Sequence, residues 1–155
     1  MKQWIRFGGG VLREATRHLL RRPVVGVAIA ATTETGLWLL VRRGDTGGWA
    51  LPGGTVEWGE TIQHTIGREL LEEAGARLRS KPQLLGVYSA PQRDYRFHAV
   101  TVLAHAKVEE TIGGPANALE IREARLFARH ELPSRLSLGM TDMLADALNH
   151  RAVLE

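Results

Sequence analysis

Residues 54–76, GTVEWGETIQHTIGRELLEEAGA, constrain this chain more than any other stretch. They follow Gly53, and three of their five glutamates, Glu69, Glu72 and Glu73, stand at the spacing i, i+3, i+4. A helix brings residues at that spacing to one face, where like charges repel. Hard divalent cations bind carboxylate oxygens well and also hold substrate phosphates. The spacing therefore predicts a metal site that faces a phosphate-bearing substrate.

A glutamate-rich helix is also a common solvated surface, because Glu, Arg and Leu are good helix formers. That plain interpretation would suit any one of these glutamates alone, but three on one face behind a double glycine favour the metal site. The pattern predicts a helix over residues 61–75, which Thr61 can cap and Gly75 can end. The same helix carries a stripe of core residues: Ile62, Ile66, Leu70 and Ala74.

The complete pattern resembles the Nudix box. It reads Gly54, five residues, Glu60, seven residues, then Arg68-Glu69-Leu70-x-Glu72-Glu73-x-Gly75, with Ala76 in the final apolar position. The resemblance covers 23 of the 155 residues. It implies an α/β fold of the α/β/α sandwich type, in which helices flank a mixed β-sheet. It also implies a hydrolase that cleaves the diphosphate of a nucleoside diphosphate linked to another group, X.

The resemblance assigns roles to single residues as well. It implies that Glu69, Glu72 and Glu73 bind Mg²⁺ or Mn²⁺ together with the backbone carbonyl of Gly54. The expected catalytic groups on the helix are Glu73, Glu72 and Arg68, and Arg68 would orient a carboxylate. Two further glutamates have expected supporting roles: Glu60 at the start of the helix, and Glu57 as an additional candidate ligand.

The general base is expected downstream of the box, because Nudix enzymes often take it from a loop glutamate there. Glu120, which follows the loop at 109–118, is the predicted base. Glu123 is the next candidate along the chain. His98 is a third candidate, because an imidazole titrates near neutral pH.

The stretch 88–98, YSAPQRDYRFH, bears on the substrate. It resembles the region of ADP-ribose and nucleotide-sugar hydrolases that reads Ser-x-Pro-x-Arg-Asp before a strand. Arg93 and Arg96 could then hold phosphate or ribose, and Tyr88 or Tyr95 could stack on a base; His98 completes the set. The same residues would also suit an ordinary hairpin loop.

The resemblance thus favours ADP-ribose or a nucleoside diphosphate sugar, cleaved to a nucleoside monophosphate and a sugar phosphate. Two alternatives with the same chemistry stay open: sanitising nucleoside triphosphates, and trimming RNA 5′ ends. An alternative of another class is a nucleotide-ligand sensor that does not hydrolyse. Such modules usually lose box glutamates or the arginine, and this chain has kept them, which favours an enzyme.

Periodicity and turn residues predict the other elements. Strands are expected at 23–31, 37–43, 84–89, 97–108 and 121–127, with a short extended piece at 49–52 and a closing helix at 140–154. Residues 23–155 are expected to form one domain. Residues 1–22 carry six basic residues and one glutamate. We expect this basic arm to pack on its own domain or on a partner in a homodimer; a transit peptide and an RNA- or membrane-facing arm are the alternatives.

Composition sets wider limits. The chain has no cysteine, which excludes disulfides, thiolate metal sites and a cysteine nucleophile, and which fits a reducing cytoplasm. The net charge is +3, and 17 of the 20 basic residues are arginines, whose planar fork matches phosphate oxygens. No apolar run reaches membrane-spanning length, so a membrane partner is not expected. The expected partner is a small nucleotide, and a nucleic acid is not expected.

Overall fold

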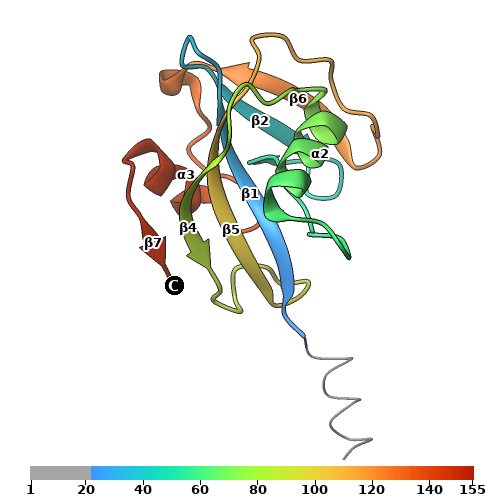
Figure 1. The fold of residues 1–155 in the computed structure, drawn as a ribbon. Coiled ribbons are helices and arrows are strands. Elements are labelled where there is room, and N and C mark those ends of the chain that lie inside the picture. Colours follow the sequence, from blue (N-terminus) through green and yellow to red (C-terminus); the bar gives the residue numbers. More distant parts are fainter. Residues whose placement is uncertain (1–21) are drawn as a thin grey trace, which may run out of the picture.

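The computed structural model describes residues 22–155, which form a mixed β-sheet with a helix on each face (Figure 1). The strands are β1 (Val24–Thr32), β2 (Trp38–Arg43), β3 (Trp49–Ala50), β4 (Gln83–Tyr88), β5 (Ala99–Lys107), β6 (Ile121–Phe127) and β7 (Val153–Leu154). The helices are α2 (Ile62–Ala74) and α3 (Thr141–Leu148), with a 3-10 turn, η1, at Arg129–Glu131. The predicted fold class is thereby confirmed.

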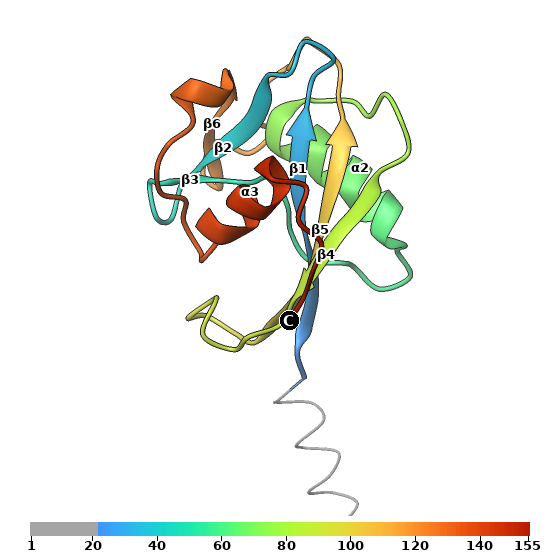
Figure 2. The ribbon, with the colours of Figure 1, turned by 90° about the vertical axis from the view of Figure 1, so that its left-hand side faces the viewer.

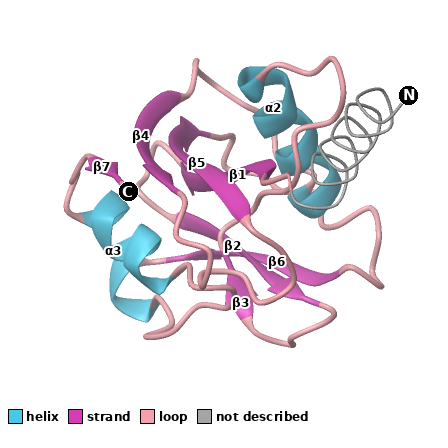
Figure 3. Ribbon diagram, turned by 90° about the horizontal axis from the view of Figure 1, so that it is seen from below, coloured by secondary structure: helices cyan, strands magenta, loops and turns pink. Residues whose placement is uncertain are grey.

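The central strand β1 is covered on both faces. Val27, Ile29 and Ala31 pack in the core that includes α2, whereas Ala28 and Ala30 pack in the core that includes α3. Figures 2 and 3 show the two helices on opposite sides of the strands. A strand buried on both faces has a continuous apolar sequence, which explains the unbroken run of residues 23–31.

A split in the sheet positions the double glycine. β1 pairs with β5 in parallel along its whole length, but it pairs with β2 only at Thr32 and Trp38. Residues 52–56 run along β1 beyond that point: Pro52 and Gly54 each accept a backbone hydrogen bond from β1, both at 2.8 Å. The glycine segment is therefore fixed against the central strand directly before α2.

The predicted strands lie within two residues of those observed, and α2 has the predicted ends. The Thr61 hydroxyl accepts the backbone N–H of His64 at 3.2 Å. Gly75 ends the helix with φ 61°, in the left-handed region that glycine adopts readily.

The closing helix is shorter than predicted. The prediction of a helix from residue 140 to residue 154 is wrong, because α3 ends at Leu148 and His150 takes a left-handed conformation with φ 50°. The backbone N–H of Arg151 then bonds back to the carbonyl of Asp146 at 2.9 Å. Val153 and Leu154 pair with β4 as the edge strand β7. Helical periodicity in residues 149–154 is thus overruled by strand pairing.

The basic arm lies outside the described residues except for Arg22, and its packing and the homodimer remain predictions. Within residues 22–155, every helix is too short or too polar to cross a bilayer.

Candidate active site

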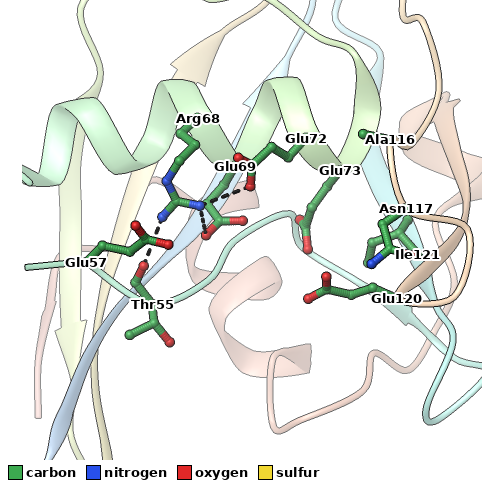
Figure 4. A pocket seen from close by; sticks show the side chains of 10 residues that line it. All are labelled: Thr55, Glu57, Arg68, Glu69, Glu72, Glu73, Ala116, Asn117, Glu120 and Ile121. Carbon is green, nitrogen blue, oxygen red and sulfur yellow. Dashed lines mark hydrogen bonds and ion pairs between the residues drawn. The ribbon is translucent and has the colours of Figure 1, made fainter.

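The carboxylates of α2 line a cleft of about 480 Å³ (Figure 4). Glu69 and Glu73 are buried, with 8% and 5% of their surface exposed, whereas Glu72 is exposed. The rest of the cleft is formed by the loop before α2, by Arg68, and by the segment leading into β6: Thr55, Glu57, Ala116, Asn117, Glu120 and Ile121. The volume falls within the range of about 300–1,000 Å³ that is usual for small-molecule sites.

Arg68 connects the loop to the acidic side of the helix. Its guanidinium donates to both oxygens of Glu60, at 2.9 and 3.1 Å, and to the Thr55 carbonyl at 3.1 Å. It also donates to Glu69 at 2.9 Å and to Glu72 at 3.1 Å. The hydrogen bonds that Glu60 accepts, above all those from Arg68, lower the pKa of Glu60 well below its usual value. Glu60 therefore stays ionised and holds Arg68 in place.

Glu73 is a buried carboxylate beside a glycine backbone. It accepts the Gly53 N–H at 2.8 Å. Burial nevertheless raises the pKa of Glu73 to about 8, and the neighbouring Glu69 and Glu120 carboxylates act in the same direction. Burial also raises the pKa of Glu69. Ionising both groups would thus bring together negative charge that the protein balances only in part.

The backbone at Gly54 lies against the Glu69 carboxylate. A Cβ at position 54 would collide with that carboxylate, so this close approach requires glycine. The Gly54 carbonyl accepts the Val27 N–H at 2.8 Å, which uses one of its two lone pairs. The Gly54 backbone therefore lies beside a buried carboxylate, and its carbonyl has a second lone pair.

The donor set fits a hard divalent cation, although it is not preassembled. Among residues 22–155, no three Asp, Glu or His side chains form a ready-made metal cage, and Arg68 holds Glu69 and Glu72 by hydrogen bonds. Carboxylate and carbonyl oxygens are the ligands that Mg²⁺ and Mn²⁺ prefer. A cation would favour the ionised form of the buried carboxylates, whose pKa is raised.

Only one of the three predicted bases lies in the cleft. Glu120 lines it, and its carboxylate points toward that of Glu73 (Figure 4). Glu123 instead lies 3.9 Å from Arg42 in an exposed ion pair. His98 is exposed, with Nε2 2.9 Å from the Ser89 carbonyl oxygen. Asn117 also lines the cleft, and the sequence carried no signal for it beyond its nearness to Glu120.

A second cavity of about 280 Å³ continues from the first. The two share three lining residues: Thr55, Glu69 and Glu120. The second cavity extends to the loop between β4 and β5, where Arg96 and Phe97 line it, and to the segment before α3, where Leu138 lines it. The acidic cleft and the second cavity are therefore two parts of one longer site.

The predicted substrate arginines differ in their availability. Arg96 lines the second cavity, bonds Asp94 at 2.6 Å and lies 3.5 Å from Asp45. Arg93 also lines it, but its guanidinium donates to Glu155 and Asp142, with a contact of 2.8 Å to each. Internal partners thus occupy Arg93, which links segments of the fold.

The predicted stacking residues do not face the cavities. Tyr88 is 1% exposed, its hydroxyl donates to Asp146 at 2.8 Å, and the Arg93 guanidinium covers its ring at 4.6 Å. The prediction that Tyr88 stacks on a base is therefore wrong, because β4 directs this ring into the core that includes α3. Tyr95 is 82% exposed on the loop and lines neither cavity.

Arg43 is a cavity residue that was not predicted from the sequence. It lies at the end of β2, and Asp45 accepts two hydrogen bonds from it, at 2.9 and 2.8 Å. This pair lowers the pKa of Asp45 to about 2 and keeps both groups charged. Arg43 lines the second cavity, and its charge stabilises the ionised form of Glu73. A strand ending in Arg-Arg before Gly-Asp was the available signal.

Comparisons with known proteins agree with this geometry. A family model described as the NUDIX domain matches residues 20–147. A relative from Methanocaldococcus jannaschii named ADP-ribose pyrophosphatase is 36% identical over 119 residues, which cover 75% of this chain and 68% of the relative.

Solved structures match as well. A MutT NUDIX hydrolase from Burkholderia pseudomallei aligns with a TM-score of 0.69 and 27% identity, covering 81% of this chain and 98% of that chain. The NUDIX domain of Shewanella oneidensis NrtR, complexed with ADP ribose, aligns with a TM-score of 0.72 over 84% of this chain and 90% of that chain. At 20% identity, the second likeness concerns the fold alone.

The family match extends far beyond the 23-residue motif, over most of the sheet and both helices. It includes every carboxylate that lines the acidic cleft. This chain therefore belongs to the Nudix hydrolase family and is a pyrophosphohydrolase that acts on phosphoric anhydrides.

Proposed function

We propose that the protein hydrolyses ADP-ribose or a nucleoside diphosphate sugar to a nucleoside monophosphate and a sugar phosphate. The observation that carries this proposal is the continuity of the acidic cleft with a second cavity lined by Arg43, Arg96 and apolar side chains. A diphosphate with a bulky group at each end needs both halves of such a site. The 36% identity to an ADP-ribose pyrophosphatase supports the same substrate class.

The chain's own groups divide the chemistry between them. Glu69, Glu72 and Glu73, with the Gly54 carbonyl, would hold Mg²⁺ or Mn²⁺, which would neutralise phosphate charge and acidify water. Glu120 accepts a proton from the attacking water while the water oxygen forms a bond to phosphorus. The bond between that phosphorus and the bridging oxygen breaks, and the bridging oxygen leaves on the other product. Arg68 keeps two of the carboxylates oriented.

A substrate panel tests the proposal. Purified protein with Mg²⁺ is assayed on ADP-ribose, nucleotide sugars, dinucleoside polyphosphates, nucleoside triphosphates and 5′-triphosphate RNA, and the products are separated by ion-exchange chromatography. We expect AMP and ribose 5-phosphate from ADP-ribose. Activity confined to triphosphates or to RNA would refute the preference, and binding without turnover of any substrate would favour a sensor.

Glu73→Gln is expected to remove most turnover, at least about a hundredfold in kcat, with metal present. Gln keeps an oxygen for the Gly53 N–H, so circular dichroism and Tm should match a folded protein. The matched control is Glu110→Gln, which removes an exposed carboxylate bound to Thr35 outside both cavities. Chelation of metal should abolish activity and added Mg²⁺ should restore it. Equal turnover by metal-free protein would defeat the metal assignment.

Two substitutions test the identity of the general base, one at Glu120 directly before β6 and one at Glu123 within β6. Glu120→Gln is expected to lower kcat by roughly 10²–10⁴-fold, the usual worth of a general base. Glu123→Gln should change kcat by less than about twofold, because Glu123 pairs with Arg42 outside the cleft. If the two variants lose activity equally, Glu120 is not the base.

A further inference from the structure

Leu138 has a backbone conformation that leucine avoids. Within residues 22–155, the non-glycine residues with positive φ are Leu138, at 55°, and His150, at 50°. A left-handed conformation is unfavourable for leucine because its Cβ approaches the following carbonyl oxygen. Such residues persist where the surroundings hold them, and they concentrate at ligand sites.

Hydrogen bonds hold the segment around Leu138 on both sides. On one side, the backbone N–H of Ser137 donates to the Trp49 carbonyl at 2.8 Å. On the other, Arg93 donates to the Gly139 carbonyl at 3.2 Å. These contacts come from β3 and from the loop between β4 and β5. The conformation of Leu138 is therefore imposed by tertiary structure.

The Leu138 side chain does not contribute to either core. Its neighbours Leu136, Met140 and Met143 pack in the core that includes α3, but Leu138 packs in neither core cluster. It lines the second cavity instead. Phe97 shares this behaviour, since it is 41% exposed, lies outside both clusters and lines the same cavity. Core packing thus does not account for the unfavourable backbone.

We propose that Leu138, with Phe97, forms the contact for the nucleobase of the substrate, and this rests on the proposed function. The acidic cleft suits the diphosphate, and the sugar phosphate end is rich in hydroxyls and charge. The flat apolar face of a base is the part of the substrate that gains most from an apolar wall. Met140 and Met143 line the same cavity and add polarizable sulfur, which favours aromatic contacts.

The test removes the side chain while easing the backbone. Leu138→Gly adopts the left-handed conformation without penalty, so its Tm should equal or exceed that of the wild type. The Kd for AMP, measured by titration calorimetry with Mg²⁺, should rise about tenfold, equal to about 1.4 kcal/mol. The Kd for ribose 5-phosphate should change less than about twofold, because that probe has no base.

Leu138→Asn is the second variant, because Asn tolerates the left-handed region but replaces the apolar group with a polar one. It should weaken AMP binding as Leu138→Gly does. His150→Gly is the matched control: it eases the same kind of backbone at an exposed residue outside the cavity. Its Tm should be equal or higher, with the Kd for both probes unchanged.

Unchanged AMP binding in both Leu138 variants would overturn this inference, and so would a loss confined to ribose 5-phosphate. Neither result touches the proposed function, which depends on whether the wild type cleaves ADP-ribose or a nucleotide sugar. Conversely, binding is measured without turnover, so a failure of the substrate panel leaves the AMP result readable.

Discussion

At the scale of single residues, burial separates residues that look alike in sequence. Tyr88 and Tyr95 flank the same loop, yet Tyr88 is 1% exposed and Tyr95 is 82% exposed. The Tyr88 hydroxyl reaches Asp146, a buried carboxylate that also accepts Arg151 at 2.7 Å. Burial and this hydrogen bond raise the pKa of Tyr88, so the phenol stays protonated and donates. A tyrosine that suits stacking on a base is here part of a buried polar network.

Tyr88→Phe tests that assignment. The change leaves Asp146 with one partner fewer in the core, and the free energy of unfolding in urea should fall by about 1–2 kcal/mol. KM should not change, because Tyr88 lines neither cavity. Tyr95→Phe is the control and should leave stability within about 0.5 kcal/mol of the wild type. A large rise in KM for Tyr88→Phe would restore a role in substrate binding.

At the scale of elements, α2 combines chemistry with ordinary helix ends. Its apolar stripe packs under β1, its cap residues satisfy the end groups, and its acidic side faces the cleft. Two glycines, one within α2 and one at its C-terminal cap, differ in whether the structure has room for a Cβ. Gly75 has φ 61°, and a Cβ there would lie 2.7 Å from the backbone of Gly113. Gly67 lies in the helix, where a Cβ would meet only a Leu78 methyl at 3.6 Å.

The two glycine-to-alanine substitutions should therefore change stability in opposite directions. Gly75→Ala should lower the free energy of unfolding by at least about 1–2 kcal/mol, since it combines strain with a backbone clash. Gly67→Ala should raise it by about 0.5–1 kcal/mol, because alanine favours the helix more than glycine does. Urea denaturation followed by circular dichroism measures both. Equal effects of the two would contradict the assigned helix end.

At the scale of the whole molecule, Arg93 joins segments that are distant in sequence. It lies in the loop after β4, and it contacts Asp142 in α3 and Glu155 beyond β7, each at 2.8 Å. The backbone N–H groups of Ser89 and Ala90 donate to the same Glu155 carboxylate. The hydrogen bond from Arg93, with these others, lowers the pKa of Glu155 to about 2.

The contribution of Arg93 should depend on pH in one direction. The folded pKa of Glu155 lies below its ordinary value of 4.5, so the stabilisation is complete above about pH 4.5 and is lost as the pH falls toward 2. Arg93→Ala should lower Tm by a few degrees at pH 7, and the difference from the wild type should shrink as the pH falls from about 4.5 toward 2. Arg79→Ala, at an exposed position, is the control and should show no such convergence.

Local sequence alone determined most elements and the acidic face of α2. Spacing within one helix decides which of Glu69, Glu72 and Glu73 share a face, and the continuous apolar run of β1 reflects burial on both sides. Thr61 and Gly75 mark the helix ends for equally local reasons. These features depend on neighbours within a few residues, which the sequence displays directly.

Tertiary structure decided the rest. The closing helix stops because residues 153–154 find a partner in β4, and Tyr88 is buried because α3 covers its strand. Arg43 and Leu138 line the second cavity only because β2, the loop after β4 and the segment before α3 converge there. Contacts between residues far apart in the chain have no periodicity or spacing in the sequence. The acidic cleft was therefore predictable, whereas of the second cavity only Arg93 and Arg96 were predicted, and Arg43 and Leu138 were not.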